Sequence, residues 1–515
     1  MSKIRTYSRS LLSNWIGFGV SLLVVAFLSP FVVHRLGTVA YGAWSLLVTL
    51  TGYLAMLDMG VKASTGRYIN YCLGRGEPDR VSNIVNTSMF LYTLVSALVI
   101  GAAIVLGVFF GDVFTKVPKD LAWQARWALP MLGVCIWANF FSATLAQMLQ
   151  AKDRFDLSSA AQVTVVAVRA AATVWVLLTA YSLTALAGVS MATGLLSCGL
   201  LWVLVLKKGP ALHLGVKYVD YPTLRALLSF GVWAFISNTA WSLILYAACP
   251  IIGLLIGIEA IAFYSVGLML ADQAGQVLSH VANVMAPDIF KAAGANNLAD
   301  IRWLTLKGTR TTLCLAVPLL TGFIMLGQDF VVLWMGPAFA QSYPVLALLS
   351  LLQLAVVSSI PCVQALQGLG RVRVIATVSV VTAVISIAIS LVLVMVFKMG
   401  IVGVAMGTLL PGCVEALVFR PYYACKHMKA SLLEWLRKTV FVAIVVGAIF
   451  AACCMLARSL VPIRGWGSFF AVVGIASAMY LPVGLFGLID AAQRRLLLES
   501  AGAPFKMICR LLTVR

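Results

Sequence analysis

The sequence predicts an all-α integral membrane protein that crosses the bilayer about fourteen times. Three observations support this class. The chain of 515 residues is 62% hydrophobic and only 10% charged, whereas soluble globular proteins carry about 25% charged residues. The hydrophobic residues form long blocks, each of about the length that a helix needs to cross a hydrocarbon layer of about 30 Å. Positive charges are concentrated in alternate connecting segments.

The N-terminal half contains the first eight blocks. Residues 11–33 are expected to remain as a spanning helix rather than to act as a cleaved signal peptide, because Pro30 and a short turn lead into the next apolar block without a small-residue cleavage pattern. The expected spans are residues 11–33, 41–57, 84–110, 127–149, 157–180, 183–206, 228–256 and 261–285. Six more follow, at residues 311–333, 343–365, 374–397, 400–419, 439–457 and 466–489.

The net charge of +20 is explained by membrane topology. If the N-terminus is cytoplasmic, about 29 Lys and Arg residues fall in inside segments and about 7 in outside segments, so the positive-inside rule places both termini in the cytoplasm. Cations at that face also attract the anionic head groups of membrane lipids. The charge therefore gives no reason to expect a nucleic-acid partner.

An internal repeat appears when the chain is laid on itself with a shift of about 215 to 220 residues. Pro30, Gly37, Ala40, Gly74, Leu149, Gln150 and Arg154 fall on Pro250, Gly257, Ala260, Gly294, Leu366, Gln367 and Arg371. The repeat predicts two six-helix lobes, residues 1–210 and 211–430, related by a pseudo-twofold axis along the membrane normal. Residues 431–515 would add two helices and a cytoplasmic tail.

The connecting segments argue against an enzyme. No outward loop exceeds about sixteen residues, whereas a membrane glycosyltransferase needs a sizeable loop or domain with acidic residues around a metal or sugar. No G-x-x-x-x-G-K-[ST] phosphate loop is present, so ATP hydrolysis is not expected. Most cysteines lie in apolar runs and no pair shows metal-ligand spacing beside one of the four histidines. We therefore expect no metal or cofactor, and a proton or sodium gradient is a candidate driving force.

Arg169 is the clearest candidate functional residue, because an ionisable side chain inside a span is costly. Ser158, Gln162 and Thr173 share its face at helical spacing, so this polar stripe should face protein or a cavity. The alternative is that Arg169 forms an ion pair with a neighbouring helix.

A second polar stripe lies in residues 261–285, and five polar residues on one helix face indicate a wet wall. Asp272, Gln276, Ser279, His280 and Asn283 form it. Asn14, Asn238 and Glu415 are weaker candidates in other spans, for which helix packing is an equal explanation.

Short motifs in the chain resemble those of the Wzx-type polysaccharide flippases. The N-terminal signature is Ser29-Pro30-Phe31 through Leu36-Gly37 and Tyr41-Gly42-Ala43-Trp44, then Leu57-Asp58-Met59-Gly60 and Arg67-Tyr68. Leu333-Trp334-Met335-Gly336 and Ser342-Tyr343 resemble the segment after the ninth span. At Asp58-Met59-Gly60 the family more often has Leu before Gly.

The resemblance implies a MATE-like fold of two lobes around a central cavity, in the superfamily of the multidrug MATE exporters and lipid II flippases. It also implies transport of an undecaprenyl-pyrophosphate-linked oligosaccharide across the bacterial inner membrane for surface polysaccharide (lipopolysaccharide-type) synthesis, and a polymerase or chain-length machinery as candidate partners. Arg169 would hold the pyrophosphate, while the amides and His280 would meet sugar hydroxyls. In the rival interpretation, a cation-coupled multidrug exporter, Asp272 and Glu415 bind drug or coupling ion.

Overall fold

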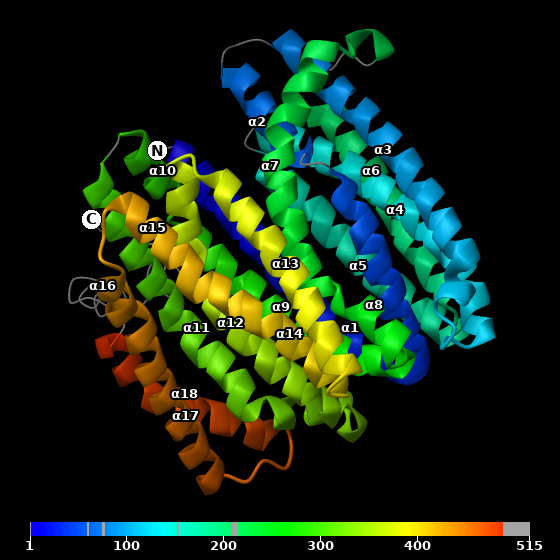
Figure 1. The fold of residues 1–515 in the computed structure, drawn as a ribbon. Coiled ribbons are helices and arrows are strands. Elements are labelled where there is room, and N and C mark those ends of the chain that lie inside the picture. Colours follow the sequence, from blue (N-terminus) through cyan, green and yellow to red (C-terminus); the bar gives the residue numbers. More distant parts are fainter. Residues whose placement is uncertain are drawn as a thin grey trace. The chain divides into compact units, whose positions relative to one another are not determined.

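A computed structural model describes residues 2–58, 61–74, 78–151, 154–208, 215–295 and 297–487 (Figure 1). These residues are nearly all helical, with no strand among them, which confirms the predicted all-α class. The helices of the first half are α1 (Ser2–Ala55), η1 (Met56–Asp58), α2 (Val61–Gly74), α3 (Pro78–Val113), α4 (Lys119–Ala151), α5 (Phe155–Thr179), α6 (Leu183–Lys208), η2 (Val216–Tyr218), α7 (Tyr221–Tyr246) and α8 (Ala248–Leu255). The helices of the second half are α9 (Ile258–Asn283), α10 (Ala286–Gly294), α11 (Leu298–Met335), η3 (Pro337–Ser342), α12 (Tyr343–Gly368), α13 (Val372–Met395), α14 (Gly400–Val414), η4 (Glu415–Phe419), α15 (Arg420–Met428), α16 (Leu432–Leu436), η5 (Arg437–Phe441), α17 (Val442–Leu460) and α18 (Trp466–Gly487).

Ten helices among the described residues are long and apolar enough to cross a membrane, and two shorter apolar helices, Ser242–Leu255 and Trp466–Tyr480, accompany them. Each segment that the sequence predicts to span lies mainly in helical residues, although the segment 228–256 is divided between α7 and α8 and residues 488–489 lie outside the described residues. The total of about fourteen crossings stays a prediction.

The first two expected spans fall within α1, which consists of two helical segments joined by a kink at Gly37, between residues 33 and 41, where the sequence predicts a short turn. α1 runs from Ser2 to Ala55 and is interrupted only at Gly37, where φ is 78° and ψ is 166°. Because this φ lies in the region that only glycine adopts readily, Gly37 allows the backbone to leave the helical conformation at this residue and to change direction. A kink therefore separates the two segments.

The first compact unit comprises Met1–Ser242 together with Cys249–Ala262. Within it α4 packs against both α3 and α6, and α1 packs against α5. A buried apolar cluster contains residues from each of the five helices α2, α3, α4, α5 and α6. Its members include Ile69, Val85, Leu145, Ala161 and Leu201. This core fixes the mutual positions of α4, α5 and α6.

α1 touches the start of α9 backbone to backbone inside the first unit. A Cβ atom built at Gly42 would overlap the carbonyl oxygen of Ile258. One turn earlier, the Thr38 hydroxyl donates a hydrogen bond of 2.8 Å to the Glu259 carboxylate. The absence of a side chain at Gly42 therefore permits this approach.

We expect Gly42→Ala to destabilise the protein by about 1 to 3 kcal/mol, because the added methyl group forces the two backbones apart. The matched control is Gly52→Ala in the same helix, where nothing lies within 4 Å of the new Cβ and Ala is the better helix former. Thermal unfolding of the detergent-solubilised variants measures both effects. Equal melting temperatures for the two variants would contradict the assigned contact.

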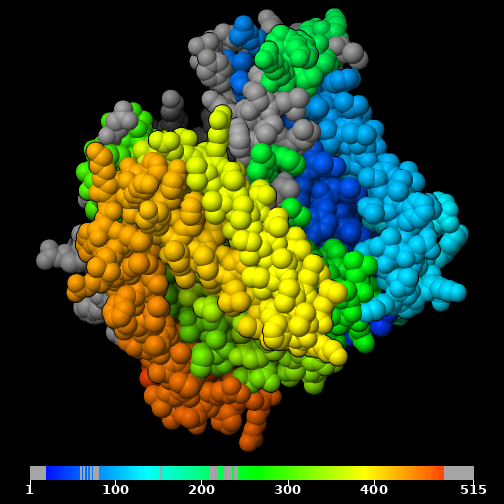
Figure 2. All heavy atoms as spheres, in the orientation of Figure 1, coloured from blue at the N-terminus to red at the C-terminus, as the bar shows by residue number. Residues whose placement is uncertain are grey.

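The second compact unit comprises Leu243–Ala248 and the described part of Phe263–Arg515. α11 packs against α12 and α17, α13 packs against α14, and α17 packs against α18. Figure 2 shows α13 in yellow and α17 in orange on the visible face of this unit. The two-lobe division predicted near residues 210 and 430 stays a prediction.

The internal repeat is visible in the helix boundaries of the two units. α5 and α13 begin 217 residues apart, and so do α6 and α14. Tyr181 and Lys398, which precede α6 and α14 at the same offset, have positive φ values of 42° and 54°. The peptide N–H groups of Arg154 and Arg371 each donate to the carbonyl five residues earlier, at 2.9 and 2.8 Å. Equivalent positions in α4–α6 and α12–α14 can therefore be compared residue by residue.

Candidate functional site

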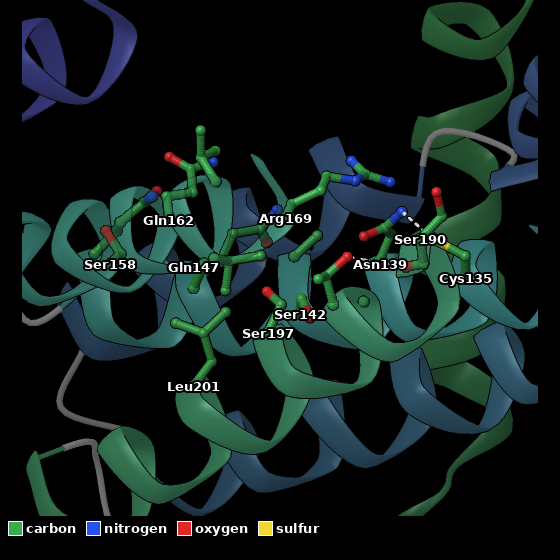
Figure 3. A pocket seen from close by; sticks show the side chains of 17 residues that line it. Cys135, Asn139, Ser142, Gln147, Ser158, Gln162, Arg169, Ser190, Ser197 and Leu201 are labelled. Atoms are coloured by element: carbon green, nitrogen blue, oxygen red, sulfur yellow. Dashed lines mark hydrogen bonds between the residues drawn. The ribbon is translucent and has the colours of Figure 1, made fainter. Parts of the chain in front are cut away.

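A polar pocket of about 430 Å³ lies inside the first unit, among α4, α5 and α6. Figure 3 shows its lining side chains, which come from all three helices. The lining residues are Cys135, Asn139, Ser142, Ala143, Ala146, Gln147, Gln150, Ser158, Gln162, Val165, Val166, Arg169, Ser190, Thr193, Gly194, Ser197 and Leu201. Amides and hydroxyls dominate the polar part of this surface, which we call the first-unit pocket.

Helical periodicity explains why polar residues from α5 meet in the pocket. Ser158, Gln162 and Arg169 follow each other at intervals of four and seven residues, so they share one face. They span about 16 Å along the helix axis at 1.5 Å per residue. The pocket is therefore elongated along the helices. In the predicted topology α5 begins at the cytoplasmic face, which puts Ser158 near the cytoplasm and Arg169 near the middle of the membrane.

α4 and α6 contribute polar faces that the sequence analysis missed. Asn139, Ser142 and Gln147 from α4 and Ser190 and Thr193 from α6 all line the pocket. Ser142 and Gln147 follow Asn139 by three and eight residues, and Thr193 follows Ser190 by three, which is a helical signal comparable to the one on α5. Hydroxyls in spans are weak indicators alone, because Ser and Thr can bond to their own helix backbone, as the Thr193 hydroxyl does to the carbonyl of Val189 at 2.8 Å.

Arg169 is the sole charged residue among the described residues that line the pocket. Its side chain is exposed, and its guanidinium interacts with the Cys135 thiol. Within the described part of the chain, no carboxylate lies at ion-pair distance from Arg169. The alternative that Arg169 pairs with a carboxylate of a neighbouring helix finds no partner among these residues. The pocket thus has a positive charge and neutral hydrogen-bonding walls.

The structure brings Gln162 and Arg169 together in the pocket, as their shared helix face predicts. Their role in binding stays a prediction. The side chains of Asn14 and Asn238 lie outside the described residues.

The second predicted stripe lies on α9, whose polar residues belong to the second unit. Asp272 accepts hydrogen bonds from the Gln276 amide at 2.9 Å and from the Tyr246 hydroxyl at 3.3 Å. The side chain of Gln364 on α12 donates to the Asn283 side chain at 2.8 Å. Gln276 and Asn283 are exposed, as is His280 on the same helix, while Asp272 is half-buried. The proposed cavity-lining and coupling roles of this stripe stay predictions.

Glu415 lies in a buried ion pair inside the second unit. Its Oε1 atom accepts hydrogen bonds from Arg420 Nη2 at 2.8 Å, Arg420 Nε at 3.1 Å and the Ser379 hydroxyl at 2.7 Å. Arg420 also donates to the Ser359 hydroxyl at 3.2 Å. Glu415 is 3% exposed and Arg420 is 8% exposed. We call these four residues the second-unit ion-pair cluster. Arg420, which directly follows the expected span 400–419, thus lies buried within a helix.

A second pocket, of about 340 Å³, lies among α11, α12, η4 and α17 of the second unit and is almost entirely apolar. Its lining offers few hydrogen-bonding groups. Among the residues that the structure describes, no group of three or more His, Cys, Asp or Glu side chains could hold a metal ion.

The family model described as "Polysaccharide biosynthesis protein" matches residues 8–292 of the chain. Over 510 residues the chain is 22% identical to "Uncharacterized membrane protein EpsK" of Bacillus subtilis, covering 95% of this chain and 96% of that protein. It is also 23% identical over 255 residues to "Putative O-antigen transporter" of Shigella flexneri, covering 49% of this chain and 59% of that protein.

Solved structures share the fold at low sequence identity. An inward-facing multidrug resistance MATE family transporter of the MOP superfamily matches with a TM-score of 0.70 and 12% identity, covering 82% of this chain and 98% of that chain. The lipid II flippase MurJ in an inward closed conformation matches with a TM-score of 0.67 and 12% identity, covering 91% of this chain and 97% of that chain. The chain therefore has the fold of these membrane transporters.

Proposed function

Because the chain belongs to the polysaccharide biosynthesis protein family, we propose that it is a flippase that carries an undecaprenyl-pyrophosphate-linked oligosaccharide across the bacterial inner membrane. The family and the fold together indicate a membrane transporter rather than an enzyme. The observation that carries the finer proposal is the first-unit pocket, where the Arg169 guanidinium, with no carboxylate partner among the described residues, stands among neutral amides and hydroxyls.

The chemistry of the pocket matches both polar parts of such a substrate. A pyrophosphate accepts charge-assisted hydrogen bonds, and the planar fork of Arg169 is suited to bidentate contact with it. Sugar hydroxyls exchange neutral hydrogen bonds with amides such as Gln147 and Asn139. The lipid tail stays among the acyl chains, because burying it in a polar pocket would forfeit its apolar surroundings. Substrate would load from the cytoplasmic leaflet, where the Ser158 end of the pocket lies in the predicted topology.

Translocation would proceed by alternating access of the two six-helix lobes, as in other transporters built from repeats. Both termini would be cytoplasmic. Asp272 on α9 is the candidate coupling group, because a half-buried carboxylate held by Gln276 and Tyr246 can exchange a proton or sodium ion as its surroundings change.

A gene-deletion strain tests the proposal. We expect loss of surface glycan and accumulation of its lipid-linked precursor in the inner leaflet, both restored by a plasmid copy of the gene. The two readouts together separate failure of translocation from failure of precursor synthesis. Normal surface glycan with increased sensitivity to cationic drugs would reject the flippase and favour a multidrug exporter, the function class of the MATE transporter that shares this fold.

A further inference from the structure

The second unit contains, at the place equivalent to the first-unit pocket, a site that is already filled by its own carboxylate. At the offset of 217 residues set by the helix starts, Gln162 on α5 corresponds to Ser379 on α13, and Ser142 on α4 corresponds to Ser359 on α12. Both serines of the second unit belong to the second-unit ion-pair cluster. Ser379 donates to the carboxylate and Ser359 accepts from the guanidinium.

The first unit has the binding groups of this arrangement without the carboxylate. Gln162 and Ser142 both line the open pocket, beside Arg169 (Figure 3). The Ser142 side chain is 7% exposed, and its hydroxyl has no hydrogen-bond partner among the described residues. A buried hydroxyl without a partner costs free energy, which a bound acceptor would recover. Lining carboxylates are absent from the described part of the pocket.

We propose that the first-unit pocket binds one anionic group of carboxylate or phosphate size, held by Arg169, Gln162 and Ser142, and that this bound anion has the role that the Glu415 carboxylate has in the second unit. The guanidinium comes from α5 in the first unit and from α15 in the second, but it plays the same part. This inference rests on the proposed function and deepens it, because it assigns the anionic part of the substrate to a single unit. The second unit, sealed by Glu415, takes no external anion.

The described pocket wall next to the proposed anion position is uncharged apart from Arg169. Beyond Arg169, the described pocket offers only uncharged polar groups such as Gln147, Asn139 and Ser190. A glycan portion next to the anion therefore contacts uncharged hydrogen-bonding groups, and a negatively charged sugar would find no second cation in the described lining. The bound substrate class is an anion linked to a neutral sugar.

Binding of defined probes to the purified full-length protein in nanodiscs tests this site. The probes are inorganic pyrophosphate and undecaprenyl pyrophosphate, titrated by calorimetry in nanodiscs of neutral lipid and again with phosphatidylglycerol present. Binding of both probes identifies phosphate chemistry at the pocket. Competition by phosphatidylglycerol would show that a lipid head group occupies the same site. If neither inorganic pyrophosphate nor undecaprenyl pyrophosphate binds, the proposal is wrong.

Substitutions then separate the roles of the three residues. Ser142→Ala and Gln162→Ala should each weaken binding by about tenfold or more, the range for a hydrogen bond to a charged group. Gln162→Glu, nearly the same size as the native residue, places a carboxylate in the pocket as Glu415 does in the second unit and should abolish binding. Thr164→Ala, an exposed position on the same helix, is the matched control and should bind as the wild type does.

The outcomes distinguish this inference from the proposed function. If Gln162→Glu and Ser142→Ala bind pyrophosphate like the wild type, the three-residue site is wrong, even where the deletion strain still loses its surface glycan. If the deletion strain keeps normal glycan while the variants lose probe binding, the anion site stands and the flippase proposal fails.

Discussion

Replacing Arg169 with Ala is expected to reduce surface polysaccharide to the level of the deletion strain, while the protein still reaches the membrane. Arg169 is the sole charge in the described pocket, and each hydrogen bond to a charged group contributes about 1.5 to 3 kcal/mol. Loss of a bidentate contact would therefore lower affinity for a phosphate by a factor on the order of a hundred or more. Immunoblots of the surface glycan and of the tagged protein in membranes measure the two quantities.

Two variants make this experiment specific. Lys207→Ala removes an exposed cation from α6 in the same unit but outside the pocket, so it should leave the glycan unchanged. Arg169→Lys keeps the charge but loses the planar fork, so it should retain partial activity. Wild-type polysaccharide in the Arg169→Ala strain, at normal protein abundance, would reject Arg169 as a substrate-binding residue.

Replacing Glu415 with Ala is expected to destabilise the protein by about 3 to 5 kcal/mol, because it leaves a buried guanidinium without its counter-ion. Arg420 is 8% exposed, and its Nη2 and Nε groups both donate to Glu415. Thermal unfolding in detergent measures the loss. The matched control is Glu434→Ala, which breaks the exposed Glu434–Lys438 pair and should change the melting temperature little.

A double variant decides whether this ion pair does more than stabilise the fold. Glu415→Leu with Arg420→Met replaces both charges by apolar side chains of similar volume and should recover most of the lost stability. A stable double variant that still exports glycan would exclude Glu415 as a coupling residue. A stable but inactive one would support the coupling role predicted from the sequence. An unstable double variant would contradict the expected energetics of the pair.

The α5 half of the site was predictable from sequence because Arg169 and Gln162 share a helix face inside an apolar run. A single ionisable group in a span is a strong signal, and helical periodicity assigns its neighbours. The same reasoning located the α9 stripe around Asp272. Comparison of the chain with itself gave the repeat, and its offset matches the separation of Tyr181 and Lys398, which both have positive φ values.

The features that the sequence did not predict depend on tertiary structure or on irregular backbone. The α4 and α6 faces became a site only through their packing against α5, which no single-helix pattern encodes. The Glu415–Arg420 contact was missed because residues five apart do not face each other on an α-helix. η4 is a π-helix, in which the Arg420 peptide N–H bonds to the Glu415 carbonyl, and this wider turn brings both side chains to one side.

The sealed and open versions of one duplicated site imply different tolerances to sequence change in the two halves of the molecule. A substitution at Ser379 or Glu415 is expected to destabilise the folded protein, because the buried charges of Glu415 and Arg420 compensate each other. Around Gln162 and Ser142, an altered side chain meets an open space and leaves the scaffold standing. Duplication thus left one copy as a buried ion pair and the other as an open pocket, which in the proposed flippase could change with the glycan that is carried.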